Sequence, residues 1–227
     1  MAQRLVIPSR EEVDDELPVA RPWWQFSVRF NVAVSQSVPV ARMHEREAEG
    51  VMMRWGLVLR TEHGTLSYTS RGTVRSDALR SVPNLERMWL NGQRGIVPLA
   101  GFYFWQRAAA GHDQPYYVRV VNRPVFGVAA LWDRAEAGDE VIESCALITV
   151  AANPLLAQTN PATGQMPAIL SAKDYEPWLS SGVPQAHELL RPYSHTRMVC
   201  HPVAPYVNHP QFDEPGLIRP ADPPGNP

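Results

Sequence analysis

The sequence predicts a single α+β domain with an extensive, mostly antiparallel sheet and few short helices. Short apolar or alternating runs dominate the 227 residues, and no regular crossover helices separate them, which excludes a doubly wound βαβ chain. Proline is abundant, with 22 residues against 14 glycines. Because proline is poorly tolerated inside helices and central strands, this composition predicts short elements joined by many defined turns.

Six segments have the pattern of β-strands. Residues 26–32 alternate apolar and polar side chains, as a half-buried strand does. Residues 144–150 are apolar almost throughout, so this run is expected at the centre of a sheet. The other expected strands are residues 51–59, 95–105, 116–121 and 125–131.

Three short helices are expected. The first lies within residues 76–89 and is broken at Pro83, because proline disrupts a helix interior. The second covers residues 171–179, where Ser171 is suited to the N-cap position. The third covers residues 184–190. Residues 221–227 are rich in proline and polar side chains, and we expect them to form a disordered tail behind a domain of residues 1–220.

Composition limits the class of protein. A formal net charge of −2 excludes the strongly basic, histone-like mode of nucleic-acid binding but leaves a local basic groove possible. Two cysteines do not make a disulfide framework, which indicates a reducing compartment. No apolar run approaches the ~20 residues that span a bilayer, and the N-terminus lacks the apolar region of a signal peptide. We therefore expect a soluble, cytoplasmic protein with no membrane partner.

General motifs for cofactors, metals and nucleophiles are missing. The sequence has no phosphate-binding glycine pattern and no zinc-finger spacing, and its seven histidines form no i, i+4 pair on an expected helix. No cofactor or metal is therefore implied. Cys145 lies in the most apolar strand and is expected in the core. Cys200 and His201 are adjacent on an expected strand, where they point to opposite faces and cannot form a dyad.

Several segments resemble, in the same order, motifs of the SOS response-associated peptidase (SRAP) family, whose members act on abasic sites in single-stranded DNA. Residues 53–58 (MRWGLV) resemble the family's RWGLVP strand, and residues 94–105 (RGIVPLAGFYFW) are similar to its R-C-L-[IV]-P-A-x-G-F-Y-E-W stretch. The resemblance covers residues 1–220 and implies an SRAP-like α+β fold. The other matching segments are residues 29–36, 114–117, 129–132, 147–152, 165–170, 178–179, 207–208 and 213–218.

The resemblance also implies a chemistry for which this chain lacks the residues. In the family, an N-terminal cysteine exposed by removal of the initiator methionine captures the sugar aldehyde as a thiazolidine. An asparagine, a glutamate and a histidine move protons around it. Alanine supplies no thiolate, and neither phenylalanine nor threonine transfers protons as a carboxylate or imidazole does. We expect a pseudoenzyme whose vestigial catalytic positions are Ala2, Thr69, Phe104 and Thr163.

Binding of single-stranded or abasic DNA without a cross-link is the expected function. The resemblance places Arg4 and Arg71 at the DNA-binding cleft, and guanidinium groups bind phosphates and stack on bases. The family's wedge residues, by contrast, match Leu59 and Thr61. Further arginines close in sequence are Arg42, Arg54, Arg75, Arg80 and Arg94. The predicted DNA-binding residues are Arg4, Arg71, Asn31, Trp55 and Arg94; Asn31, Trp55 and the motif residue Asn208 are equally suited to organising turns and core.

Two alternatives stay open. Removal of Met1 would give Ala2 a free α-amine with a pKa near ~7.7, able to form a reversible Schiff base with an abasic-site aldehyde and to act as a lyase. The other alternative is an accessory role with an unknown protein partner. It predicts a large exposed apolar patch where Phe104 replaces a charged residue.

Overall fold

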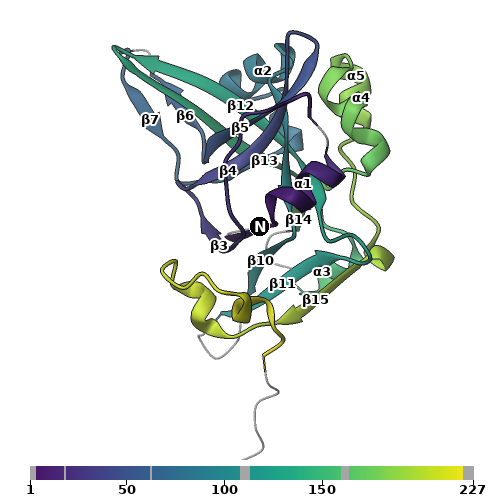
Figure 1. The fold of residues 1–227 in the computed structure, drawn as a ribbon. Helices are drawn as coiled ribbons and strands as arrows, with labels where there is room; N and C mark the ends of the chain where they lie inside the picture. Colours follow the sequence, from purple (N-terminus) through teal and green to yellow (C-terminus); the bar gives the residue numbers. More distant parts are fainter. Residues whose placement is uncertain (1–3, 18, 62, 108–112, 160–163, 222–227) are drawn as a thin grey trace, which may run out of the picture.

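Two sheets and a small hairpin make up the fold in a computed structural model that describes residues 4–17, 19–61, 63–107, 113–159 and 164–221. The first sheet has five antiparallel strands in the order β15-β11-β10-β1-β3. It forms the lower half of the molecule in Figure 1, and the larger sheet forms the upper half. The strands of the first sheet are β1 (Arg4–Ile7), β3 (Arg29–Ala33), β10 (Gly101–Gln106), β11 (Gln114–Val120) and β15 (Met198–Pro202).

The larger sheet has eight strands, and its central part closes on itself. The order is β14-β13-β12-β9-β4-β5-β2, with β8 paired to β13. Because β13 also pairs with β5, the strands β13, β12, β9, β4 and β5 form a closed ring, which leaves no free edges between them. The strands are β2 (Arg21–Pro22), β4 (Ser37–His44), β5 (Glu47–Trp55), β8 (Thr73–Arg75), β9 (Arg94–Leu99), β12 (Phe126–Ala137), β13 (Glu140–Ala151) and β14 (Gln165–Pro167).

Short helices and one separate hairpin surround the sheets. The hairpin pairs β6 (Val58–Arg60) with β7 (Leu66–Tyr68). In Figure 1, α2 lies at the top of the molecule and α4 and α5 lie together on one side. The α-helices of the described residues are α1 (Arg10–Glu16), α2 (Pro83–Leu90), α3 (Pro154–Thr159), α4 (Tyr175–Ser180) and α5 (Val183–Glu188). None of them is long and apolar enough to cross a membrane.

The expected α+β class with few short helices is confirmed, but two expected strands are each divided. The run 95–105 forms β9 and β10, which belong to different sheets and meet at Ala100. At this corner a Cβ on Gly101 would lie 2.3 Å from the ring of Tyr117, so only glycine allows the approach. The run 51–59 is divided in the same way into β5 and β6 at Gly56, whose φ is +109°.

The helices show where the sequence interpretation needs correction. Pro83 does not break a helix: it occupies the first turn of α2, where its missing N–H costs nothing. Ser171 precedes a 3₁₀ turn and makes no side-chain capping bond, so α4 begins only at Tyr175. Helix α1 was not expected. Ser9 and Glu12 form a capping box there, with Glu12 N donating to Ser9 Oγ at 3.2 Å and Ser9 N donating to Glu12 Oε2 at 2.9 Å.

The C-terminal segment packs on the five-stranded sheet through a second, smaller core. This core joins side chains of β1, β10 and β11 to Val203, Val207 and Leu217. In Figure 1 the segment, in yellow, lies against the lower end of β10 and β11. The backbone N–H of Ala221 donates to the carbonyl oxygen of Pro202 at 2.8 Å. The rest of the expected tail, residues 222–227, lies outside the described residues.

Candidate nucleic-acid interface

Arg4 lies at the start of β1, between the two strands that flank it. In register it faces Ala33 of β3 and Tyr103 of β10. Its guanidinium carbon is 6.0 Å from the centre of the Trp105 ring, which is within the range of a cation–π contact. Partial burial lowers the pKa of the Arg4 guanidinium from its ordinary value, although an arginine stays protonated in proteins. The start of β1 thus presents a cation beside an indole.

Trp105 joins Arg4 to the C-terminal segment. The indole Nε1 of Trp105 donates a hydrogen bond of 2.6 Å to Oδ1 of Asn208. Asn208 and Arg4 are both residues to which the family resemblance points, and they are 204 positions apart in the chain. The structure therefore brings Arg4, Trp105 and Asn208 together, and we call these three residues the Arg4 group.

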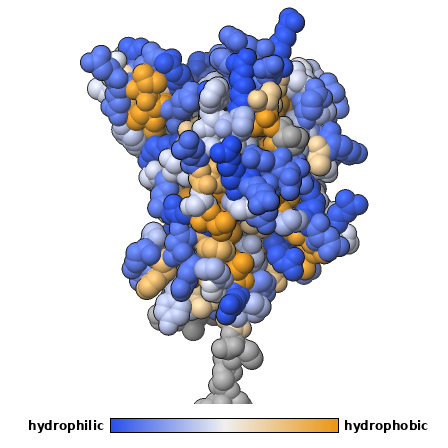
Figure 2. Space-filling view, in the orientation of Figure 1, coloured by the Kyte–Doolittle hydropathy of each residue, from blue (hydrophilic) through white to orange (hydrophobic). Residues whose placement is uncertain are grey.

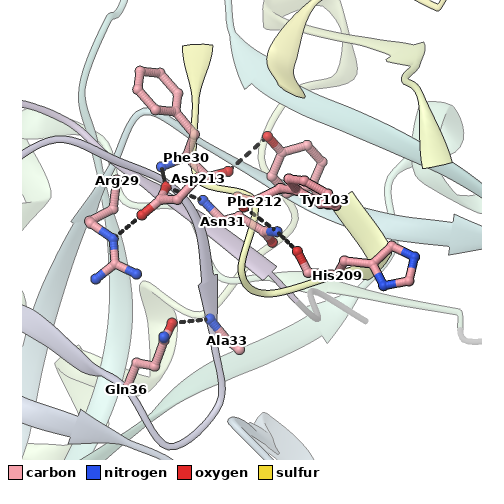
Figure 3. Close-up of polar contacts among 9 residues, drawn as sticks. All are labelled: Arg29, Phe30, Asn31, Ala33, Gln36, Tyr103, His209, Phe212 and Asp213. Atoms are coloured by element: carbon pink, nitrogen blue, oxygen red, sulfur yellow. Dashed lines mark hydrogen bonds and ion pairs between the residues drawn. The ribbon is translucent and has the colours of Figure 1, made fainter. Parts of the chain in front are cut away.

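Asn31 holds the segment that carries Asn208. Its side-chain Nδ2 donates to the carbonyl oxygens of His209 at 3.1 Å and Phe212 at 2.9 Å (Figure 3). It also donates to the carbonyl oxygen of Val207 at 3.2 Å. Asn31 is completely buried. Its amide is thus engaged with backbone carbonyls, which is the turn-organising role, and the burial argues against direct contact with DNA.

Asp213, in the C-terminal segment, also attaches this segment to β3. Its carboxylate accepts from the backbone N–H of Asn31 at 3.1 Å, from that of Phe30, and from Nε of Arg29 (Figure 3). Tyr103 adds a hydrogen bond of 2.9 Å from its hydroxyl to the carbonyl oxygen of Phe30. A charge-assisted network of this kind fixes residues 207–213 against β3.

An exposed group of rings lies on this fixed segment. Tyr206 is 64% exposed and Phe212 is 41% exposed, and their rings meet edge to face at 5.9 Å. The ring of His209 contacts Phe212 at 6.0 Å in the same way. We call Tyr206, His209 and Phe212 the aromatic cluster. Exposed rings on a rigid segment are suited to stacking of unpaired bases.

The Arg4 group and the aromatic cluster were only partly predictable. The sequence interpretation identified Arg4 and Asn208, but it missed Trp105 as their link and the cluster itself. The available signal was the spacing of Tyr206, His209 and Phe212 among the prolines at 205, 210 and 215, without the period of a strand or a helix.

Of the positions that the family resemblance marks as vestigial, the structure describes Phe104 and Thr69. Phe104 is only 3% exposed, and its ring stacks on Tyr116 with centroids 5.6 Å apart and planes 9° apart. Phe104 itself therefore contributes little to any exposed apolar patch. Thr69 follows β7, where its hydroxyl donates to the carbonyl oxygen of Arg71 at 3.2 Å. Ala2 and Thr163 lie outside the described residues.

Two other predicted DNA-binding residues are parts of the core. Arg94 is 4% exposed, and its Nε donates to the carbonyl oxygen of Trp178 at 2.7 Å, while Nη2 donates to that of Ser181. Burial lowers the pKa of this guanidinium, whose carbon lies 5.7 Å from the centre of the Trp89 ring and 5.8 Å from that of Trp178. Trp55 is completely buried and donates from Nε1 to the carbonyl oxygen of Gly72 at 2.7 Å. These contacts argue against a DNA contact for either side chain.

Arg71 is exposed, unlike the other predicted DNA-binding residues. It follows the β6–β7 hairpin, which approaches the end of β3 closely: a Cβ on Gly56 would lie 2.9 Å from Val34 and 3.2 Å from the carbonyl oxygen of Thr69. Arg54 lies at the same junction, donating to Ser35 and to the carbonyl oxygen of Gly56. Arg42 and Arg75 are instead held in ion pairs by Glu49, Glu143 and Asp77.

The two cysteines of the chain pack in or against the main core. Cys145 is completely buried in β13, and burial raises the pKa of its thiol to about 12. Cys200 faces the main core, with its sulfur 3.7 Å from the hydroxyl oxygen of Thr159. His201 faces the second core and lies 2.9 Å from the carbonyl oxygen of Ile218. The expected opposite orientation of Cys200 and His201 is confirmed.

Iodoacetamide at pH 8 is expected to modify Cys200 of the native protein and to leave Cys145 unmodified. The Cys145 thiol stays protonated in the fold, because its native pKa lies above the ~8.5 of an unfolded cysteine. As the pH rises past ~8.5, the unfolded state loses this proton first, so the contribution of Cys145 to the free energy of unfolding falls. Mass spectrometry of peptides, with a urea-unfolded sample as control, checks this. Equal labelling of both cysteines in the native state would contradict it.

No group of three or more metal-ligating side chains occurs among the described residues.

Comparisons with known proteins identify one family. The family described as SOS response associated peptidase (SRAP) matches residues 2–210. The chain is 24% identical over 202 residues to the abasic site processing protein YoqW of Bacillus subtilis, covering 87% of this chain and 88% of YoqW. It is 27% identical over 248 residues to the abasic site processing protein HMCES of Mus musculus, covering 91% of this chain and 69% of HMCES.

Solved structures show the same fold. A protein from Bordetella bronchiseptica has a TM-score of 0.76 at 21% identity, over 90% of this chain and 100% of that one. A protein from Bacteroides thetaiotaomicron has a TM-score of 0.73 at 24% identity, over 84% of both chains. Since the family match spans nearly the whole chain, the protein belongs to the SRAP family.

Proposed function

We propose that this protein binds single-stranded DNA at abasic sites, in the context of DNA damage, without forming a covalent cross-link. The family and the printed names of the two curated relatives support a role at abasic sites. One combined observation carries the proposal. The contacts of the Arg4 group are in place, whereas the position that matches the family's glutamate holds Phe104, which is buried and stacked on Tyr116.

The surface suits a single strand for two physical reasons. Arg4 and Arg71 supply guanidinium groups for phosphates, and the aromatic cluster supplies rings on which bases can stack. Both interactions tolerate any base sequence, which a binder of lesions requires. The four vestigial positions are occupied by alanine, threonine and phenylalanine, which have no titratable side chain for the family's chemistry.

The test is titration of a labelled single-stranded oligonucleotide, intact or carrying one abasic site, at two salt concentrations. We expect affinity for both to fall steeply with salt, because binding releases counterions from the phosphates. Replacing Tyr206 and Phe212 together with alanine is expected to weaken binding at least about tenfold, since each lost stacking contact costs ~1–3 kcal/mol. Trp23→Ala is the matched control, because Trp23 is an exposed aromatic residue, 69% exposed, outside the aromatic cluster.

A borohydride arm separates the proposal from the Schiff-base alternative. We expect no trapped adduct on the abasic strand. A trapped adduct, with removal of Met1 verified by mass spectrometry, would assign lyase-like chemistry to the Ala2 amine and contradict purely non-covalent binding. Salt-independent binding, or no binding in any arm, would overturn the proposal and favour the accessory role with a protein partner.

A further inference from the structure

A hollow lies next to the β6–β7 hairpin. Its volume is about 340 Å³, at the small end of the range for ligand pockets. It lies between β6, the segment from Thr69 to Arg75, and the start of α2. Its apolar walls are formed by Leu57, Leu59, Val74, Ala78, Val82 and Leu85.

The polar residues of this pocket are basic or neutral. Arg71 and Arg75 line it together with Thr69, Thr73 and Asn84, and none of the described residues that line it is acidic. Arg75 is held by Asp77, whereas Arg71 is an exposed guanidinium. An apolar hollow with an exposed cation matches a ligand that has an apolar ring and an anionic group.

The pocket is close to the proposed DNA surface. It includes Thr69, the match to the family's asparagine, and Leu59, the match to a wedge residue. The close approach at Gly56 joins this hairpin to the end of β3, next to the residue that pairs with Arg4. In Figure 2, one of several orange apolar patches lies over the region of β6 and β7.

We propose that this pocket receives an unstacked nucleobase that neighbours the abasic site, with Arg71 on the phosphate of the same nucleotide. The inference rests on the proposed function and names where a specific part of the strand is held. An abasic site has no base to stack on its neighbours, so unstacking an adjacent base costs least there. The apolar walls then cover the faces of the base, and the amide of Asn84 can donate to or accept from its edge.

The probe is a single-stranded 12-mer with one tetrahydrofuran abasic analogue and one fluorescent 2-aminopurine directly on its 5′ or 3′ side. Transfer of the 2-aminopurine from the strand into an apolar pocket is expected to raise its fluorescence on binding. A second 12-mer replaces that base with another tetrahydrofuran. We expect its affinity to be about tenfold lower, because it leaves the pocket empty.

Two variants with matched controls assign the effect to this pocket. Val82→Trp fills the hollow from its rim and is expected to weaken binding of the first 12-mer about tenfold and to abolish the fluorescence rise. Leu90→Trp, at the other end of the same helix and also exposed, is expected to change neither. Arg71→Ala is expected to reduce affinity and the salt slope, whereas Arg46→Ala, in the β4–β5 turn, removes one charge elsewhere with little effect.

The outcomes distinguish this inference from the proposed function. Salt-sensitive binding with equal affinity for both 12-mers, and equal behaviour of the Val82 and Leu90 variants, would overturn the pocket and leave DNA binding intact. Absence of binding to either 12-mer by the unmodified protein would overturn both. Thermal unfolding of each variant verifies that the fold is retained.

Discussion

Phe104→Glu is expected to destabilise the protein by about 3–4 kcal/mol at pH 7, the cost of burying a carboxylate without a partner. Phe104 is 3% exposed in the main core, and its ring stacks on Tyr116. The substitution removes this packing and introduces a charge among apolar side chains. Restoring the residue that the family has at this position is therefore expected to damage the fold rather than to restore activity.

The pH dependence of the Phe104→Glu variant provides the check. Burial raises the pKa of the introduced carboxyl above that of an unfolded glutamate, ~4.3. The destabilisation is therefore full at neutral pH. It becomes smaller as the pH falls through the raised native pKa, because a neutral carboxylic acid costs less to bury than a carboxylate. Urea unfolding at pH 7 and pH 5 measures this, with Phe104→Leu as the apolar control. Equal stability of the two variants at pH 7 would show that the position is not sealed.

Asn31→Ala is expected to lower the free energy of unfolding by about 3 kcal/mol, because it leaves one buried and two partly buried carbonyl groups without this donor. The amide of Asn31 donates to three carbonyl oxygens of the segment that carries the aromatic cluster. Loss of this attachment should also let Tyr206 and Phe212 change position. We therefore expect weaker binding of single-stranded DNA even where the variant remains folded.

Urea unfolding and DNA titration at a temperature below the transition measure the two effects of Asn31→Ala separately. Asn208→Ala is the control for stability, because Asn208 is exposed and its side chain bonds only at the surface, to Trp105. Its cost is expected to stay below about 1 kcal/mol. An Asn31→Ala variant that is folded and binds DNA with unchanged affinity would contradict the positioning role.

Much of the fold follows from local patterns, and the divided strands show the limit. Every expected strand overlaps an observed one, because alternation and apolar runs reflect burial directly. The runs 51–59 and 95–105 are continuous in hydropathy, yet each changes partners at a corner. The corners depend on Gly56 and Gly101, where close neighbours distant in sequence exclude a Cβ. A hydropathy pattern contains no information about those neighbours.

The candidate site was less predictable, because a motif identifies a residue without giving its direction. Asn31, Trp55 and Arg94 match family motifs and are all buried, and each donates a side-chain N–H to a backbone carbonyl. Arg4 and Asn208 also match motifs, but they lie near opposite ends of the chain. Each contacts Trp105, and neither motif predicts that contact. The role of Arg71 in DNA binding stays a prediction.

The attachment of Asn31 also has a consequence for the growing polypeptide. The first carbonyl that Asn31 binds lies 176 residues further along the chain, and the last lies 181 residues further. During translation, β3 therefore emerges from the ribosome long before its partner segment exists. The aromatic cluster can be set in place only at a late stage of synthesis, so a nascent or prematurely terminated chain has no assembled surface with which to occupy DNA.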